Sequence, residues 1–366
     1  MSTEISSLQS ALGLLQKLIA TPSFSKEEAA TAAIIADHLQ NFGIVHNRLL
    51  NNVYALNLHF DATKPCILLN SHHDTVKPAK GYTTDPFTPT LVDGKLIGLG
   101  SNDAGGPLVA LIETFRHFYA SENLPFNLIL AATAEEEISG KNGIELLLQD
   151  EIFLEKIQGA TIMGALVGEP TKMEMAVAER GLLVIDGLAL GKAGHAAREE
   201  GENAINKALL DIMAIHETGF ERVSGLIGKT TAKVTVIETE NKAHNVVPAS
   251  CRFVVDVRVN ELYTFEEVMQ TLQSRVQSEL SSRSFRLKSS IIPLDHPLVS
   301  AGHAMGLPHY GSPTTSDKAL MPFPALKIGP GDSARSHTAN EYIYIQELEE
   351  GIEKYIRLLN ITISSL

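Results

Sequence analysis

The sequence is poor in cysteine, in long apolar runs and in clustered basic charge. Its 366 residues include only two cysteines, Cys66 and Cys251, and each lies in an apolar stretch typical of a buried strand. We therefore expect two separate reduced thiols rather than a disulfide, which favours a cytoplasmic setting. No apolar run approaches the roughly 18 residues that a membrane span requires, so no membrane association is expected.

Acidic residues outnumber basic ones by 43 to 30, which gives a formal net charge of −13. Lys and Arg do not gather into a patch that could follow a phosphate backbone, so nucleic acid is not expected as a partner. The segment 1–20 carries Glu4, has no basic leader region and places Leu and Ile at helical spacing. This pattern predicts an amphipathic helix rather than a signal peptide.

The length of the chain favours two domains. Over residues 1–173, apolar strand-like segments alternate with amphipathic helical ones, a pattern typical of an α/β domain with a mostly parallel sheet and helices on both faces. Helices are expected at 4–18, 26–42 and 103–119, and strands at 53–58, 65–71, 126–133 and 161–168.

The order of the expected strands and helices changes over residues 174–287. Strand, helix, strand, strand, helix and strand follow one another, with "TFEEVMQTLQSRVQSEL" as the second helix and "FRLKSSI" as the last strand. This is the ferredoxin-like βαββαβ order. Residues 288–366, with helices expected at 296–305 and 346–360 and a strand in "FPALKIG", resemble the first domain in character. The ferredoxin-like unit is therefore expected to be an insertion in the α/β domain.

Groups that bind metals or protons follow several of the apolar runs. In α/β sheets, ligands gather at the carboxyl ends of strands. Two imidazoles and three carboxylates suit zinc, with cobalt or manganese as substitutes. A pair of cations needs one bridging carboxylate and two further ligands for each ion, a count that five side chains satisfy. The candidate groups lie at five places in the sequence: His72 with Asp74; Asp103; Glu135, Glu136 and Glu137; Glu169; and His337.

The tripeptide Glu135, Glu136 and Glu137 allows two interpretations. Three adjacent carboxylates repel one another unless cations lie among them, so one could bind metal while its neighbour acts as a base. An exposed acidic loop is the alternative, and the tripeptide alone does not decide between them.

Eight motifs in order give the chain a resemblance that covers essentially its whole length. The motifs are "SHHDTV", "GSNDAGG", "AEEEISG", "VGEPT", "GKAGHAAR", "HNVVPA", "TTSD" and "SHTANEY". With these motifs the chain is similar to the co-catalytic dizinc family of deacylases and exopeptidases that includes acetylornithine deacetylase, succinyl-diaminopimelate desuccinylase, aminoacylase and the glutamate carboxypeptidases, and most similar to the first of these.

The resemblance implies two Zn²⁺ ions per subunit, for which Co²⁺ or Mn²⁺ can substitute. His72 and Glu169 would bind one ion, Glu137 and His337 the other, and Asp103 would bridge them.

The resemblance also implies roles for residues around the metals. Asp74 would orient the His72 ring through its other nitrogen, and His73 would be a bystander. Glu136 would be the general base that takes a proton from water and delivers it to the leaving amine. His195 would stabilise the oxyanion and, in dimeric relatives, reach the site of the partner subunit.

Four further residues match family positions that grip a substrate carboxylate or acyl group: Arg180, Asn245, Arg258 and Thr315. Arginine forks suit that task geometrically. Simple solvation of these side chains is the alternative interpretation.

The sequence departs from the family pattern at several places. Ala104 follows the bridging aspartate, Glu135 replaces an aspartate, and Ala196 and Ala197 follow the inserted domain's histidine. These changes leave the zinc chemistry intact, but they do not identify the subfamily, and so they leave the substrate open. The resemblance also implies a cis peptide bond between Asp103 and Ala104.

The expected function is hydrolysis of a small N-acyl amino acid, with N-acetylornithine deacetylation in arginine biosynthesis as the leading hypothesis. A succinyl-diaminopimelate desuccinylase, or a deacylase for succinylornithine or acylcitrulline, is the near alternative. A di- or tripeptide exopeptidase and a non-catalytic small-molecule-binding protein are the others. A homodimer formed through the inserted lid domain is expected.

Overall fold

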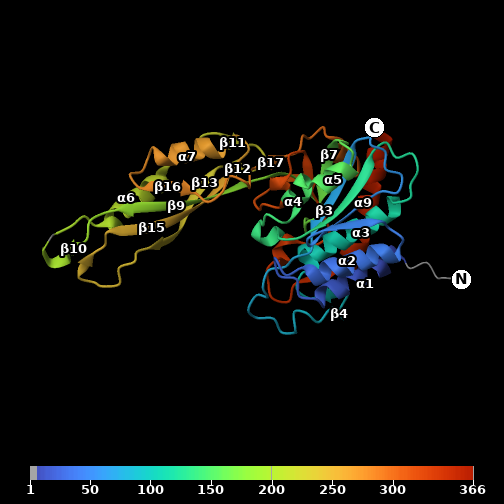
Figure 1. The fold of residues 1–366 in the computed structure, drawn as a ribbon, viewed down its shortest axis with the longest axis horizontal. Coiled ribbons are helices and arrows are strands. Elements are labelled where there is room, and N and C mark those ends of the chain that lie inside the picture. Colours follow the sequence, from blue (N-terminus) through green and yellow to red (C-terminus); the bar gives the residue numbers. More distant parts are fainter. Residues whose placement is uncertain (1–5, 199, 366) are drawn as a thin grey trace. The chain divides into compact units, whose positions relative to one another are not determined.

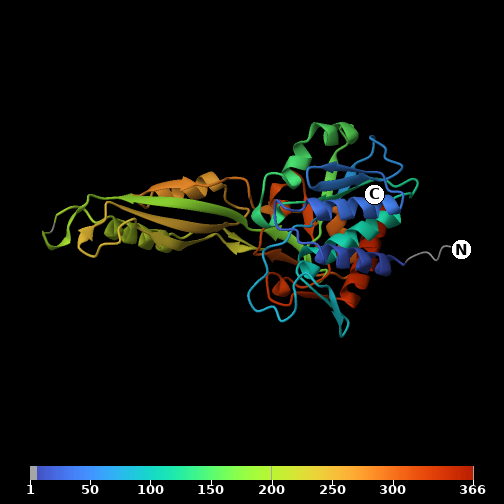
Figure 2. The same ribbon diagram turned by 60° about the horizontal axis from the view of Figure 1, so that its bottom comes forward.

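The computed structural model describes residues 6–198 and 200–365. The chain divides into two compact units, which Figures 1 and 2 show from two directions. The first comprises Met1–Val177, Ile292–Tyr310 and Ser316–Leu366, and the second comprises Ala178–Ile291 and Gly311–Thr315.

The first unit is built on a mixed sheet in the order β1-β2-β6-β3-β7-β19-β8. Strands β17 and β18 also pair with β8, and β17 belongs to the second unit together with the end of β8. The four central strands β6, β3, β7 and β19 are parallel. The strands are β1 (His46–Leu49), β2 (Asn52–Leu56), β3 (Cys66–His72), β6 (Asn127–Thr133), β7 (Ile162–Val167), β8 (Met175–Glu179), β17 (Ser290–Ile291), β18 (His309–Ser312) and β19 (Ala325–Lys327).

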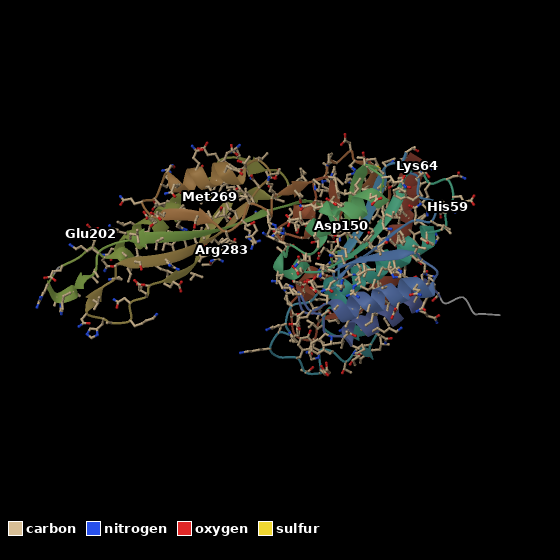
Figure 3. The ribbon with its side chains drawn as sticks, in the orientation of Figure 1. His59, Lys64, Asp150, Glu202, Met269 and Arg283 are labelled. Carbon is tan, nitrogen blue, oxygen red and sulfur yellow. The ribbon has the colours of Figure 1, made fainter. Side chains whose placement is uncertain are left out.

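Helices cover both faces of this sheet, as the sequence predicted. Helix α3 packs on β3 and β6, and α1 and α9 pack on α3. On the other face, α4 and α5 share a core with Cys66, Leu68 and Ile129, and Asp150, labelled in Figure 3, caps α5. The helices are α1 (Ser7–Ile19), α2 (Ala29–Asn41), α3 (Gly106–Phe118), α4 (Ile144–Gln149), α5 (Glu151–Lys156), α8 (Pro297–Ala304) and α9 (Ile345–Ser365).

Burial along their whole length made the central strands predictable from the sequence. Strands β3 and β6 are buried at every residue, because a sheet covered on both faces needs continuous apolar runs. Their predicted bounds are correct to within one residue.

Among the described residues, no helix is both long and apolar enough to cross a bilayer.

A small three-stranded sheet supports the loop after β5. Its strands are β4 (Thr90–Val92), β5 (Lys95–Ile97) and β20 (Tyr342–Tyr344), and β20 pairs with β5. The turn Ser101–Gly105 follows β5 after residues 98–100 and leads into α3. The predicted cis peptide bond between Asp103 and Ala104 lies in this turn and is confirmed.

The second unit has a four-stranded antiparallel sheet in the order β13-β15-β9-β16, with α6 and α7 packed on it. Phe253 lies at the centre of its core, and Met269 of α7, labelled in Figure 3, packs against that core. The elements are β9 (Gly181–Leu190), β10 (Gly194–His195), α6 (Ala204–Glu217), β11 (Val223–Ser224), β12 (Gly228–Lys229), β13 (Thr231–Glu238), β14 (Val246–Val247), β15 (Ser250–Val259), α7 (Phe265–Gln273) and β16 (Glu279–Ser282).

The sequence-based prediction is wrong about the last two elements of this unit. Helix α7 ends at Gln273, and the fourth strand is Glu279–Ser282 rather than "FRLKSSI", whose last residues Ser290–Ile291 pair with β8 instead. The physical reason lies on α6, where the buried Asp211 carboxylate accepts hydrogen bonds from the backbone N–H groups of Gln277 and Ser278. That long-range contact turns the chain where local propensity would continue the helix.

Candidate metal centre

Three adjacent parallel strands deliver candidate ligands to one edge of the sheet. Strand β3, which lies between β6 and β7, ends in His72. Glu136 and Glu137 lie in the short 3₁₀ turn after β6, and Glu169 follows β7 after a single glycine. Because the carboxyl ends of parallel strands meet at the same edge, side chains from distant parts of the sequence converge there.

Two loops complete the cluster. Asp103 lies in the turn Ser101–Gly105, and His337 follows the 3₁₀ turn Ser333–Arg335. Asp103 Oδ1 is 3.3 Å from His72 Nε2, and Asp103 Oδ2 is 3.6 Å from His337 Nε2. The aspartate therefore presents one oxygen to each imidazole, as a bridging ligand would.

The remaining carboxylates divide between the two imidazoles. Glu169 Oε1 and Glu136 Oε2 each lie 3.8 Å from His72 Nε2. Glu137 Oε2 lies 3.0 Å from His337 Nε2. His72 thus has two glutamates near it and His337 has one, with Asp103 between the two imidazoles.

Several observations fit this site to divalent cations. Ligand atoms of His72, Asp103 and Glu137 lie within 4.8 Å of one another, and so do those of His72, Glu136 and Glu169. His72 Nε2 is buried and has no hydrogen-bond partner among the described residues. A buried polar atom without a partner is costly, and a cation at that position would remove the cost. Imidazole and carboxylate ligands suit zinc.

The electrostatics of the cluster also favour bound positive charge. Burial raises the pKa of Glu169 to about 8, and it raises the pKa of Glu136 well above its usual value. The hydrogen bond to Glu137 raises the pKa of His337 to about 9. Protons or metal cations must therefore compensate this group of carboxylates.

Asp74 organises the site more widely than its expected contact with His72. His72 Nδ1 lies 3.0 Å from the Asp74 carbonyl oxygen and 3.4 Å from Asp74 Oδ1. The fully buried Asp74 carboxylate also accepts hydrogen bonds from the backbone N–H groups of Glu136 and Glu137 and from the Ser25 hydroxyl. One side chain therefore fixes both a candidate ligand and the turn that carries the candidate base.

Sequence reasoning missed Glu341, although it lies in the quoted motif "SHTANEY". Its buried carboxylate accepts hydrogen bonds from the backbone N–H groups of Gly100, Asn102 and Asp103. These bonds hold the turn that presents Asp103. The sequence could have indicated Glu341 only by its position four residues after His337. Its hydrogen-bond partners lie about 240 positions earlier in the chain, so no local pattern relates them to it.

Sequence reasoning also missed Glu28 and left His73 without a role. Glu28 Oε1 accepts a hydrogen bond from the N–H of Glu135, which starts the turn in a left-handed backbone conformation with φ 58°. His73 is buried, with Nε2 2.9 Å from the Asn51 carbonyl and Nδ1 2.9 Å from the Thr31 hydroxyl. Because the carbonyl can only accept, Nε2 donates to it. The Thr31 hydroxyl has two acceptors within reach for its single hydrogen, His73 Nδ1 and the Glu28 carbonyl.

The five other predicted site residues belong to the second unit. His195 is exposed on β10, opposite Val246 of β14, and Asn245 accepts a hydrogen bond from the N–H of Ala196 through its carbonyl. These two segments therefore form one local structure.

The two arginines and Thr315 already have partners inside that unit. Arg258 makes a two-bond ion pair with Asp256, at 2.8 and 3.0 Å. Arg180 donates to the Ile227 carbonyl through two nitrogens. The Thr315 hydroxyl donates to the Arg180 carbonyl at 3.1 Å.

The sequence of this chain matches a known class of hydrolase. The family model described as peptidase family M20/M25/M40 matches residues 68–361. The chain belongs to this family of metal-dependent amide hydrolases.

Curated relatives of the chain share one description. A succinyl-diaminopimelate desuccinylase from Delftia acidovorans is 25% identical, in an alignment that covers 95% of this chain and 97% of the relative. Another protein with that description, from Cereibacter sphaeroides, is 29% identical over 276 residues, or 72% of this chain and 71% of its own.

Solved structures show the same fold over whole chains. A tripeptidase from Staphylococcus aureus superposes with a TM-score of 0.75 at 18% identity and covers 99% of this chain and 100% of its own. A metallo-carboxypeptidase of the M20 family from Sulfolobus solfataricus gives 0.74 at 17% identity, with coverage of 97% and 99%.

Proposed function

We propose that the protein is a dizinc hydrolase that removes an N-acyl group from a small amino acid. The observation that carries this proposal is the convergence of five ligand side chains, with Asp103 directing one oxygen to each imidazole. His72 and Glu169 would hold one cation and Glu137 and His337 the other, and Co²⁺ or Mn²⁺ could replace Zn²⁺.

Two such cations would supply a water molecule of lowered pKa and would polarise the scissile carbonyl. Glu136 lies beside the candidate ligand His72, which supports its assignment as the group that takes a proton from the attacking water. The same carboxyl would then deliver the proton to the leaving amine. Asp74 keeps both Glu136 and His72 in place during this transfer.

N-succinyl-diaminopimelate is the first substrate to test, because the curated relatives carry that activity in their description. N-acetylornithine, as in arginine biosynthesis, remains the second candidate, supported by the similarity of the motifs. Both are N-acyl derivatives of amino acids that also carry a second amino group. The two buried free cysteines support a cytoplasmic site of action.

We also assign the second unit to substrate binding and to dimer formation. His195, Asn245, Arg180, Arg258 and Thr315 are the proposed contacts to the oxyanion and to the substrate's polar groups.

A homodimer is supported by two exposed features of the second unit. Strand β13 is an edge strand of its sheet, with Val236 and Ile237 exposed. Helix α6 exposes Leu209, Leu210 and Met213, which is more apolar surface than one helix usually presents to water.

The test is an amine-release assay with the zinc-loaded protein and a Glu136→Gln variant. N-succinyl-diaminopimelate, N-acetylornithine, succinylornithine, acetylcitrulline and a tripeptide form the substrate panel. We expect turnover of one N-acyl amino acid, and a fall in kcat of about 100- to 10,000-fold in the variant with its zinc content unchanged.

Glu135→Gln is the matched control, since the neighbouring Glu135 carboxylate binds Asn142 and lies outside the ligand set. We expect this variant to keep kcat within a few-fold of the wild type. Normal turnover by Glu136→Gln would show that the base is misassigned, and absence of turnover on every amide would refute the proposed function.

A further inference from the structure

The segment from Gly329 to His337 connects three of the loops that carry ligands. The N–H of Thr171 donates to the Gly329 carbonyl, and the N–H of Lys172 donates to the Gly331 carbonyl at 2.7 Å. These bonds attach the segment to the loop that follows Glu169. The segment then runs on to His337, so its placement decides where that imidazole lies.

The side chain of Asn102 attaches the same segment to the turn that carries Asp103. Asn102 is fully buried. Its Oδ1 accepts from the N–H of Asp332 at 2.9 Å, and its Nδ2 donates to the Asp332 carbonyl at 3.1 Å and to the Ser336 hydroxyl at 3.3 Å. The amide therefore pairs with the N–H and the carbonyl of one residue, Asp332, as a neighbouring strand would. Gly331 leaves room for this contact, since a Cβ there would lie 2.5 Å from Asn102 Oδ1.

Ser336 extends this connection toward His337, the next residue in the chain. Its hydroxyl accepts a hydrogen bond from Asn102 Nδ2 at 3.3 Å. Asn102 thus contacts the segment at Asp332 and again at Ser336, directly before the imidazole residue.

His337 is the candidate ligand with most need of such support. Its side chain is 53% exposed, whereas that of His72 is 1% exposed. Its backbone has φ 58°, a left-handed conformation that residues other than glycine rarely adopt. Its ring lies against Glu137 and Asp103, which are themselves candidate ligands.

We infer that Asn102 is a positioning residue that fixes His337 relative to Asp103 and so completes the second cation site. This inference rests on the proposed function, because it assumes that His337 and Asp103 bind the same ion. Outer hydrogen bonds of this kind typically change metal affinity by about 10- to 100-fold.

The test is zinc titration of the metal-free protein by calorimetry, comparing the wild type with Asn102→Ala and Asn127→Ala. Asn127 is a matched control at the amino end of β6. It is also buried, and its side chain pairs with the backbone N–H and carbonyl of Asp61, both at 2.8 Å. Both variants lose the same kind of amide pairing, but only Asn102 adjoins candidate ligands.

We expect Asn102→Ala to bind one zinc ion as the wild type does and the other about 10- to 100-fold more weakly. The visible absorption of the Co²⁺-loaded variant should also change, because it reports the ligand geometry at the metal. Asn127→Ala should keep both affinities and the wild-type Co²⁺ spectrum, although its Tm falls. Wild-type affinities and spectrum in Asn102→Ala would overturn the inference and leave that residue a purely structural role.

A second variant covers the case in which Asn102→Ala does not fold. Ser336→Ala removes one hydroxyl from the same network, and we expect it to weaken the same zinc ion and no other. Unchanged zinc binding by a folded Ser336→Ala would contradict the inference. If the wild type itself binds no pair of zinc ions, the proposed function fails, which is a distinct result from failure of the variants to differ.

Discussion

Asp74 connects the candidate ligand His72 with the turn that carries Glu136 and Glu137. Burial would raise the pKa of this carboxyl, but hydrogen bonds from His72 and Ser25 hold its pKa below the usual value. The ionised group can then accept from the N–H groups of Glu136 and Glu137. A carboxylate with several donors around it is a rigid anchor.

The variant Asp74→Asn tests this anchor. An amide can turn only one oxygen toward the donors, so its NH₂ group would face an N–H or the hydroxyl. We expect kcat/KM and zinc affinity each to fall by about 10- to 100-fold, as steady-state assays and calorimetry would measure. Ser25→Ala, which removes one donor and keeps the carboxylate, should have a smaller effect. Wild-type kinetics in Asp74→Asn would contradict the anchoring role.

Cys66 gives a prediction about pH that is independent of the metals. Burial raises the pKa of the Cys66 thiol to about 11. An unfolded cysteine has a pKa of about 8.5, so the unfolded chain loses this proton at a lower pH than the native chain does. The contribution of the thiol to the free energy of unfolding is therefore fully present below about pH 8.5 and is lost as the pH rises toward 11. We expect iodoacetamide at about pH 8 to alkylate Cys66 only after denaturation, as peptide mass spectrometry would show. Rapid alkylation of the native protein would contradict this burial.

At the scale of elements, the turn Ser101–Gly105 depends on close packing against α1. A Cβ added at Gly105 would lie 2.3 Å from the Gly100 carbonyl oxygen and 2.7 Å from Leu15 Cδ1. Neither the turn backbone nor the buried leucine can move freely. The glycine therefore allows the turn, and Asp103 with it, to lie against the helix.

Two glycine-to-alanine changes with opposite expected signs test this packing. Gly105→Ala should lower the free energy of unfolding by about 1–3 kcal/mol through overpacking. Gly13→Ala, in the interior of α1 with no atom within 4 Å of the added Cβ, should raise it by about 0.5–1 kcal/mol. Urea denaturation of the metal-free proteins would measure both. Equal effects of the two changes would contradict the packing argument.

The elements also show how far the sequence alone could lead. Strands β3, β6 and β7 were predictable because each is a continuous apolar run that ends in metal-binding groups. The end of α7 was not, because Asp211 on another helix stops it. Glu341 and Asn102 were missed for the same reason, since their partners are close only in the folded chain.

At the scale of the whole molecule, the chain leaves the first unit after β7 and returns to complete it. Residues 292–310 and 316–366 belong with residues 1–177, and His337 in the last of these segments reaches candidate ligands from the first. The short segment Gly311–Thr315 belongs to the second unit, where the Thr315 hydroxyl binds the Arg180 carbonyl. No local sequence pattern indicated that Gly311–Thr315 would belong to the second unit.

The central claim is that side chains from these separate segments hold a pair of cations. Native mass spectrometry of the zinc-loaded chain counts bound ions directly. We predict two zinc ions per wild-type chain, the number a bridging carboxylate between two imidazole–carboxylate pairs can hold, and fewer than two in Asp103→Ala. A wild-type chain with no more than one zinc ion, or an Asp103→Ala chain that keeps two, would contradict the account.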